Sequence, residues 1–352
     1  MSRKISGTPP LLGLDDVTDS KIHLFSPRDT YRYLTTTGYD LPPGAGKNYV
    51  WPSTVGGVYV TYYHAKNSKG ETYRKLLDAG YNPPEGVSVT YYLKENCKDK
   101  LTLSFFEESG SLIKSFSSIG DDNAPKLLSE SGTNQFVWDM KYPDAHQMEG
   151  DITTKGAMAG PVAPPGRYKV ELKVLGEVFS QPFEIKKDPR LTATVDELKE
   201  QFTFLMQIRD KVSETHDAIN NIRSLKRQII GWQQRASIVW DGNEDPRLDS
   251  VTRIGKEIQG ELEDIEEHLI QSKAKAPMDS LNFPTRLNEK MAALPRVVAN
   301  SDSAPTTQSY QVYASISERI DQQLVRLEKL KGTLIIEFNE LVRKLELPSV
   351  VS

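Results

Sequence analysis

The sequence predicts a multidomain protein of the β plus α class, in which an antiparallel β-sandwich precedes an antiparallel bundle of long helices. Apolar residues alternate with polar ones in the first half of the chain, and they recur at three- and four-residue steps in the second half. The chain has 352 residues, which is more than one core usually organises. At least two domains are therefore expected.

Short segments with a period of two predict the strands of the sandwich. Residues 87–93 read Val-Ser-Val-Thr-Tyr-Tyr-Leu, and residues 101–106 follow the same pattern. Turn residues, such as Leu175-Gly176, separate these segments, and no helical pattern intervenes, which favours antiparallel pairing. The other expected strands are 112–116, 168–174, 178–185 and a hairpin that pairs 58–63 with 72–76.

The helices should begin shortly after Pro189, where the period of the apolar pattern changes. Thr194 and Glu197 form a capping-box signature, which marks the start of a helix of about forty residues. Prolines fall between the later apolar stripes, where they are tolerated. The stripes cover 195–225, 248–269 and 313–341, with a shorter helix expected at 284–298. We therefore expect three parts: an N-terminal segment of 1–76, a sandwich of 77–190 and a helical bundle of 191–347.

Charge and hydropathy exclude some classes of partner. The formal net charge is −4, and neither half of the chain has an excess of Lys and Arg, so no nucleic-acid partner is expected. No apolar run approaches the roughly 20 residues of a membrane span. The first residues lack the apolar run of a secretion signal, which predicts a cytoplasmic location for the chain as written.

The residue types that usually carry catalysis or bind metals are scattered. Cys97 is the single cysteine, so no disulfide or cysteine-based zinc site is expected. Asp264 stands one turn before His268 in an acidic run, which is typical of a solvated helix face with a local ion pair. We therefore expect no catalytic, cofactor-binding or metal-binding residues and no cofactor. The five histidines, none in a metal-ligand pair, are His23, His64, His146, His216 and His268.

One enzymatic alternative rests on carboxylates. Asp139 and Asp144 could supply two acids for glycoside hydrolysis, although an aspartate in a turn usually bonds its own loop backbone. Residues 67–73 are similar to the end of an Asp box, the hairpin repeat of sialidase-type propellers. The pattern occurs once, which favours an ordinary hairpin turn because a propeller needs several blades.

Several blocks resemble the C-terminal region of large bacterial sortilin-like proteins with Asp-box repeats, which are often labelled glycosyl hydrolases. One block reads Leu-Asp-Ala-Gly-Tyr-Asn-Pro-Pro-Glu-Gly-Val at 77–87. The others are 14–17, 23–32, 91–95, 279–288 and 305–310. In that family the region follows a β-propeller, and full-length members look secreted or periplasmic. The resemblance implies a non-catalytic accessory region that binds or supports a β-propeller domain, in cis or in trans, with other proteins or glycans as further ligands.

A second resemblance concerns the sandwich. Residues 132–139, followed by Pro-Pro-Gly-Arg-Tyr-Lys-Val at 164–170, are similar to the immunoglobulin-like module of flagellar hook-capping proteins. This resemblance implies an immunoglobulin-like sandwich. Phe136 and Trp138 should point to one face and fill its core.

Two other functions stay open at this stage. The family label implies a glycan-acting, sialidase-like hydrolase. Apolar residues left over on the long helices, namely Ile229, Ile230 and Trp232, would instead favour helix-mediated oligomerisation.

Overall fold

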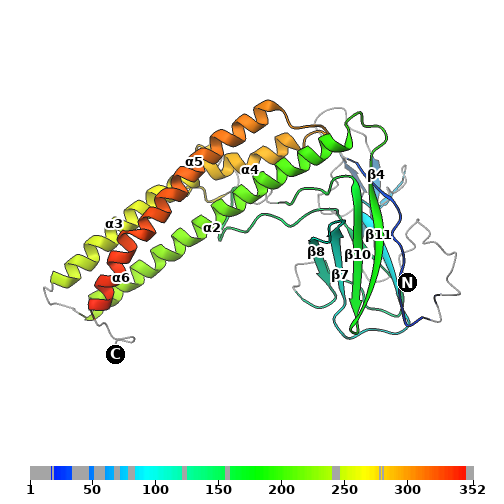
Figure 1. Ribbon diagram of the computed structural model, residues 1–352, viewed down its shortest axis with the longest axis horizontal. Coiled ribbons are helices and arrows are strands. Elements are labelled where there is room, and N and C mark those ends of the chain that lie inside the picture. Colours follow the sequence, from blue (N-terminus) through cyan, green and yellow to red (C-terminus); the bar gives the residue numbers. More distant parts are fainter. Residues whose placement is uncertain are drawn as a thin grey trace. The chain divides into compact units, whose positions relative to one another are not determined.

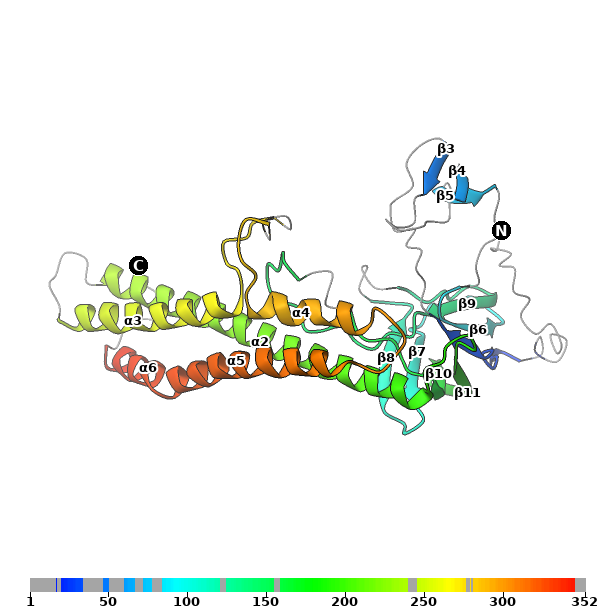
Figure 2. The ribbon, with the colours of Figure 1, turned by 90° about the horizontal axis from the view of Figure 1, so that it is seen from above.

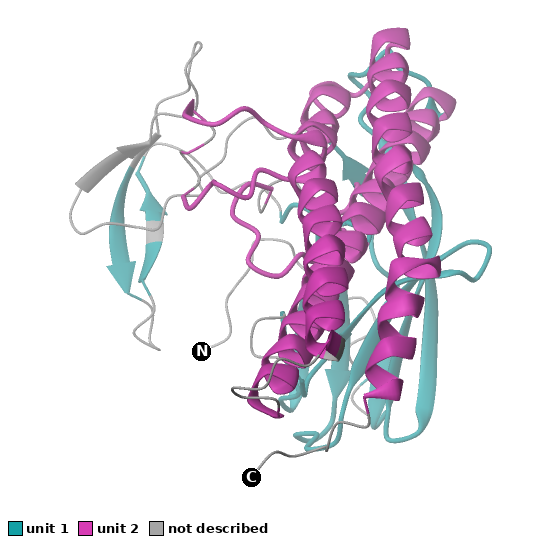
Figure 3. Ribbon diagram, turned by 90° about the vertical axis from the view of Figure 1, so that its left-hand side faces the viewer, with its two compact units in different colours: residues 1–142, 162–195 teal, residues 143–161, 196–352 magenta. Residues whose placement is uncertain are grey.

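The computed structural model describes most of the chain in two compact units. The described residues are 17, 20–33, 47–50, 60–66, 72–77, 84–120, 125–154, 159–239, 246–276, 279 and 281–345. The first unit comprises residues 1–142 and 162–195, and the second comprises 143–161 and 196–352 (Figure 3). Sheets occupy the first unit and helices the second, so the chain is of the β plus α class.

The first unit contains three sheets, and every described strand pair but one is antiparallel. The exception is β2 with β11, which pair in parallel. The three-stranded sheet has the order β1 (Ile22–Leu24), β6 (Val87–Leu93), β9 (Gly132–Trp138). The five-stranded sheet has the order β2 (Thr30–Arg32), β11 (Glu177–Lys187), β10 (Gly166–Val174), β7 (Thr102–Glu107), β8 (Leu112–Ser117) (Figure 1). A separate sheet joins β3 (Lys47–Val50), β4 (Val60–Lys66) and β5 (Thr72–Leu76).

Aromatic side chains connect the three-stranded sheet to the five-stranded sheet. Burial alternates along β6 and β9, as the period of two predicts. Trp138 stacks on Phe105 with ring centroids 4.5 Å apart, and Phe136 lies 4.5 Å from Phe116. Phe136 and Trp138 therefore point to one face and fill the core, as expected.

The N-terminal strands complete these two sheets. β1 pairs with β6, whereas β2 pairs with β11, so residues 23–32 of the first resemblance lie at the edges of both sheets. Of the Asp-box-like segment 67–73, only Thr72 and Tyr73 belong to the described residues, and both lie on β5. Residues 14–16 and 78–83 lie outside the described residues.

The described residues of the second unit form five helices. They are α2 (Val195–Val239), α3 (Pro246–Leu269), α4 (Leu287–Val298), α5 (Thr307–Gly332) and α6 (Leu334–Lys344). In Figures 1 and 2, α3 and α4 run back along α2, and α5 and α6 run in the direction of α2. The stripe expected to form one helix over 313–341 is interrupted at Thr333, whose φ and ψ are −125° and −91°. The apolar period continues across this break, which follows Gly332, a weak helix former.

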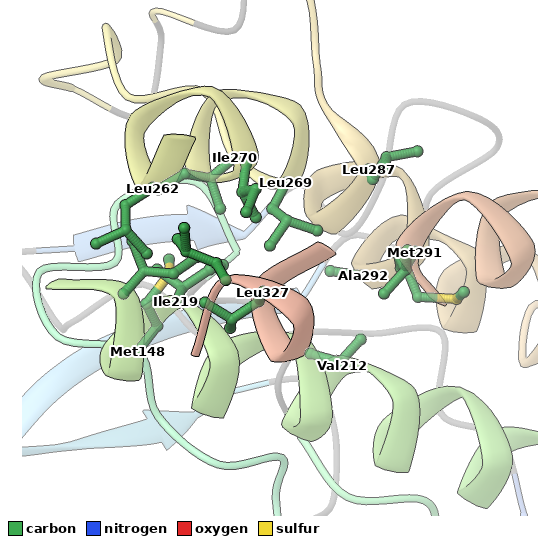
Figure 4. Packing of buried hydrophobic residues seen from close by; sticks show 14 of the residues in the cluster. Met148, Val212, Ile219, Leu262, Leu269, Ile270, Leu287, Met291, Ala292 and Leu327 are labelled. Atoms are coloured by element: carbon green, nitrogen blue, oxygen red, sulfur yellow. The ribbon is translucent and has the colours of Figure 1, made fainter. Parts of the chain in front are cut away.

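The apolar stripes predicted for the helices form one buried cluster. It includes Ile219 of α2, Leu262 of α3, Met291 of α4 and Leu327 of α5 (Figure 4). Met148, from the connection between β9 and β10, belongs to the same cluster. No helix within the described ranges combines the length and apolarity needed to cross a membrane.

Residues 143–161 lie inside the predicted sandwich range 77–190, yet they belong to the helical unit. The reason is apolar burial: Ala145 and Met148 are 5% and 6% exposed within the helical core. We call residues 143–154 the strap.

Candidate functional site

The isolated residues singled out by sequence analysis make local contacts. The His23 ring lies 4.7 Å from the ring of Phe25. The Cys97 thiol is 3.7 Å from the carbonyl oxygen of Asp99. The ring of His64 is 5.4 Å from that of Tyr62. These contacts are structural in character.

The two aspartates of the hydrolase alternative bind backbone. Asp139 Oδ1 accepts a hydrogen bond from the amide of Lys141 at 3.1 Å. Asp144 Oδ1 accepts one from the amide of Gly160 at 2.8 Å. Each carboxylate thus stabilises its own loop, as an aspartate in a turn usually does.

The acidic run on α3 is paired with α5. Asp264 accepts from Arg326 at 2.8 Å, and Glu261 accepts from the same guanidinium at 3.1 Å. His268 Nδ1 lies 2.7 Å from the Asp264 carbonyl oxygen and 3.7 Å from its carboxylate. Among the described residues, no three His, Cys, Asp or Glu side chains gather in a way that could hold a metal ion.

The structure brings two of the histidines, His146 and His216, together at the strap. His216 is fully buried on α2, and its Nδ1 donates to the carbonyl oxygen of His146 at 2.6 Å. The amide of His146 donates to Ser213 Oγ at 3.1 Å, and its ring Nδ1 lies 2.8 Å from Asp217 Oδ2. Both the backbone and the side chain of His146 are therefore held by α2.

The same face of α2 binds the strap on both sides of His146. Arg209 donates to the carbonyl oxygen of Pro143 at 3.0 Å. The side chain of Asn220 accepts from the amide of Glu149 at 3.0 Å and donates to the carbonyl oxygen of Gln147 at 2.9 Å. These contacts satisfy backbone groups that no strand or helix pairs.

Further along the face, two arginines bind Glu149. Arg223 donates to its carbonyl oxygen, and Arg227 pairs with its carboxylate at 3.0 Å. We call the α2 residues that contact the strap backbone or the Glu149 carboxylate the α2 stripe. Its members recur at steps of four and three residues, which places them on one face of the helix. The α2 stripe consists of Arg209, Ser213, His216, Asn220, Arg223 and Arg227.

The sequence-based expectations do not include the α2 stripe. Metal-ligand spacing does not relate His146 to His216, and apolar periodicity along α2 does not indicate its polar face. The signal was present, because polar residues with hydrogen-bonding side chains repeat at heptad spacing on this helix. Their partners lie 66 to 78 residues away in sequence, so the pattern alone could not name them.

A shallow hollow of about 450 Å³ lies at the end of the α2 stripe. It is lined by Glu149, Arg223, Lys226, Arg227 and Ile230. A second hollow, of about 740 Å³, runs along α5 between Tyr313 and Arg326. The first hollow combines three cations with one apolar side chain, which suits an anionic group beside an apolar one.

The residues of the oligomerisation alternative differ in exposure. Ile229 is 4% exposed and belongs to the helical core, so it is not available to a second chain. Trp232 packs against that core and lies 5.0 Å below the guanidinium of Arg235. Ile230 is 39% exposed and lines the first hollow.

The tract that precedes α2 is held by its own side chains. Lys187 Nζ donates to the carbonyl oxygens of Leu191 and Ala193 at 2.8 and 2.7 Å. Hydrogen bonds from the side chain and amide of Arg190 lower the pKa of the Asp188 carboxyl to about 2. Asp188 therefore stays ionised and paired at all ordinary pH values.

The comparisons with known proteins identify no family for this chain. No model of a protein family matches the chain, and no match was found among curated proteins. Among solved structures, a chain described as pT26-6p is similar at 13% identity and a TM-score of 0.14. The match covers 74% of this chain and 46% of that one, so this chain spans less than half of its length. A TM-score this low does not indicate a shared fold.

Proposed function

We propose that this chain is a non-catalytic accessory region that binds or supports a β-propeller domain, in cis or in trans. The resemblance to sortilin-like Asp-box proteins suggests that partner. The α2 stripe is the observation that carries the non-catalytic part of the proposal. Its polar side chains gather in one place, as in an active site, but all of them except Arg227 hydrogen-bond to the backbone of the strap.

We further propose that the first unit is an immunoglobulin-like sandwich. The order β1-β6-β9 corresponds to strands A, B and E of that fold, and the order β11-β10-β7-β8 corresponds to G, F, C and C′. The strap then belongs to the E–F connection, between β9 and β10. A single cysteine leaves the disulfide of antibody domains without an equivalent, and stacked aromatic rings occupy the core instead.

A tyrosine at the start of β10 supports the same proposal. Many immunoglobulin-like domains have a tyrosine corner, in which a tyrosine near the start of strand F bonds the backbone a few residues upstream. Tyr168 OH donates to the carbonyl oxygen of Pro164 at 2.7 Å. Burial raises the pKa of Tyr168, and the Glu107 carboxylate adds to the rise, so the hydroxyl remains a donor.

Replacing this tyrosine tests the corner. The Y168F variant removes the hydroxyl and leaves the Pro164 carbonyl unpaired, which should lower the free energy of unfolding of the first unit by about 1 kcal/mol. Urea unfolding of Y168F and of Y73F, a control on an exposed tyrosine of β5, measures the difference. Equal stability of the two variants would mean that the Tyr168 bond is incidental.

The partner itself is tested by mixing purified chain with an Asp-box propeller encoded by the same genome. Sedimentation velocity should show a faster-moving complex that neither protein forms alone. A chain that sediments unchanged at high propeller concentration would contradict the proposed partner. It would leave the immunoglobulin-like assignment untouched, because the Y168F experiment tests that separately.

The glycan-acting alternative has its own assay. We expect no turnover of a panel of aryl-glycosides and sialosides, because Asp139 and Asp144 stabilise loops in the described structure. The D139N and D144N variants serve as controls. Turnover by the unmodified protein that disappears in either folded variant would replace the accessory proposal with a hydrolase.

A further inference from the structure

The hollow at the end of the α2 stripe has the chemistry of a carboxylate site. Arg223, Lys226 and Arg227 line it with Glu149, and Ile230 supplies an apolar wall. Arginine binds carboxylates through parallel N–H donors, and lysine adds a point charge. All of these residues belong to the helical unit.

Glu266 positions two of the cations. It is 10% exposed and accepts from Arg223 Nε at 2.8 Å, while Lys226 Nζ lies 3.4 Å from its second oxygen. The Lys226 contact is long for a charged pair, and an ammonium group has three donors. Lys226 therefore keeps hydrogen-bonding capacity toward the hollow.

The contacts of Glu149 show which chemical groups the hollow binds. Its carboxylate pairs with Arg227 at 3.0 Å, and its carbonyl oxygen accepts from Arg223. The Glu149 and Arg227 side chains are 69% and 63% exposed, and an ion pair this exposed contributes little stability. A carboxylate from another protein can replace the Glu149 side chain at small cost.

We propose that this hollow binds an acidic, extended peptide segment of a partner protein. A carboxylate of that segment pairs with Arg227 and Lys226 in place of the Glu149 side chain, and a neighbouring apolar residue packs on Ile230. A peptide fits better than a nucleic acid, because the α2 stripe already binds peptide backbone in the strap.

This inference goes beyond the accessory role. The α2 stripe binds the strap with or without an external peptide, so a protein without peptide affinity could still support a propeller. A failed peptide-binding test would therefore leave the accessory proposal intact, and a failed propeller-binding test would leave the peptide proposal intact.

Fluorescence anisotropy tests the proposal with a fluorescein-labelled peptide of sequence Glu-Leu-Glu-Leu-Glu. The full chain should bind it, and added salt should weaken binding. R227Q should weaken binding about two- to fivefold, since it removes an ion pair at a guanidinium that is 63% exposed. E149Q should tighten binding about two- to fivefold, because it removes a competing carboxylate worth no more than an exposed ion pair. The matched control K199Q changes the same charge at an exposed site near the start of α2 and should have no effect.

An effect of R227Q without an effect of K199Q separates a specific site from general attraction to cations. Arg227 is exposed, so R227Q should keep the thermal stability of the unmodified protein; if it does not, K226Q serves as the second variant. Equal binding of Gln-Leu-Gln-Leu-Gln, or weaker binding by E149Q, would overturn the proposal. Displacement of the peptide by millimolar inorganic phosphate or by a DNA duplex would also overturn it, since the hollow would then be a general anion site.

Discussion

The W138A variant should destabilise the first unit by about 3–5 kcal/mol, the usual cost of emptying a large buried aromatic site. Trp138 has no exposed surface, stacks on Phe105 and donates from Nε1 to the carbonyl oxygen of Lys141 at 3.2 Å. It also lies 6.4 Å from Tyr168 and 6.3 Å from Phe183, ring to ring. Its removal therefore loosens aromatic packing from both sheets at once.

Hydrogen exchange locates this loss of stability along the chain. Peptides from β6 to β11 should exchange faster in W138A, while peptides from α3 and α5 should keep their protection, because local stability is read segment by segment. L112A is the matched control, since Leu112 is 60% exposed on β8 and should change stability by less than about 0.5 kcal/mol. A W138A protein that keeps its protection but loses affinity for a glycan or peptide would make Trp138 a recognition residue.

Local pattern was sufficient for most elements. Val87 to Leu93 alternate in sequence and in burial, because the side-chain period of a strand places every second residue on the core face. Many of the apolar positions of α2 likewise become buried positions, among them Leu198, Ile208 and Val212. These patterns depend on one property, the burial of each side chain, and that burial follows largely from the residue type.

What sequence analysis missed depends on pairing between distant segments. The strap has only Ala145 and Met148 as apolar anchors, too few for a period, and its other contacts are polar. A serine, histidine or asparagine on a helix is compatible with solvent or with a partner, and only the fold decides which. The break at Thr333 was missed for the opposite reason, since apolar periodicity runs through it without interruption. The same limit applies to the first hollow, whose cations come from α2 and whose resident carboxylate comes from the strap.

Glu289 joins three segments of the helical unit, and its removal should have the second large effect. Its Oε1 accepts from the amide of Gln271 at 2.9 Å and from Thr153 Oγ1 at 3.1 Å. Its Oε2 accepts from the amide of Arg286 at 2.7 Å, which caps the start of α4. Glu289 is only 9% exposed, so water has little access to the donors that it satisfies. One carboxylate thus holds the end of the strap, the α3–α4 connection and the start of α4.

E289A should therefore lower the free energy of unfolding of the helical unit by roughly 2–4 kcal/mol, since each buried donor left unpaired costs about 1–3 kcal/mol. E289Q keeps one acceptor oxygen and should lose about half as much, whereas E257A, at an exposed position of α3, should lose less than about 0.5 kcal/mol. Urea unfolding gives the three values, and hydrogen exchange should show faster exchange of the strap in E289A than in E257A. If E289A and E257A unfold at the same urea concentration, the three donors have other acceptors and Glu289 does not join these segments. If stability falls while the strap keeps its protection, the α2 stripe alone holds the strap, and Glu289 acts only on the α3–α4 connection and the start of α4.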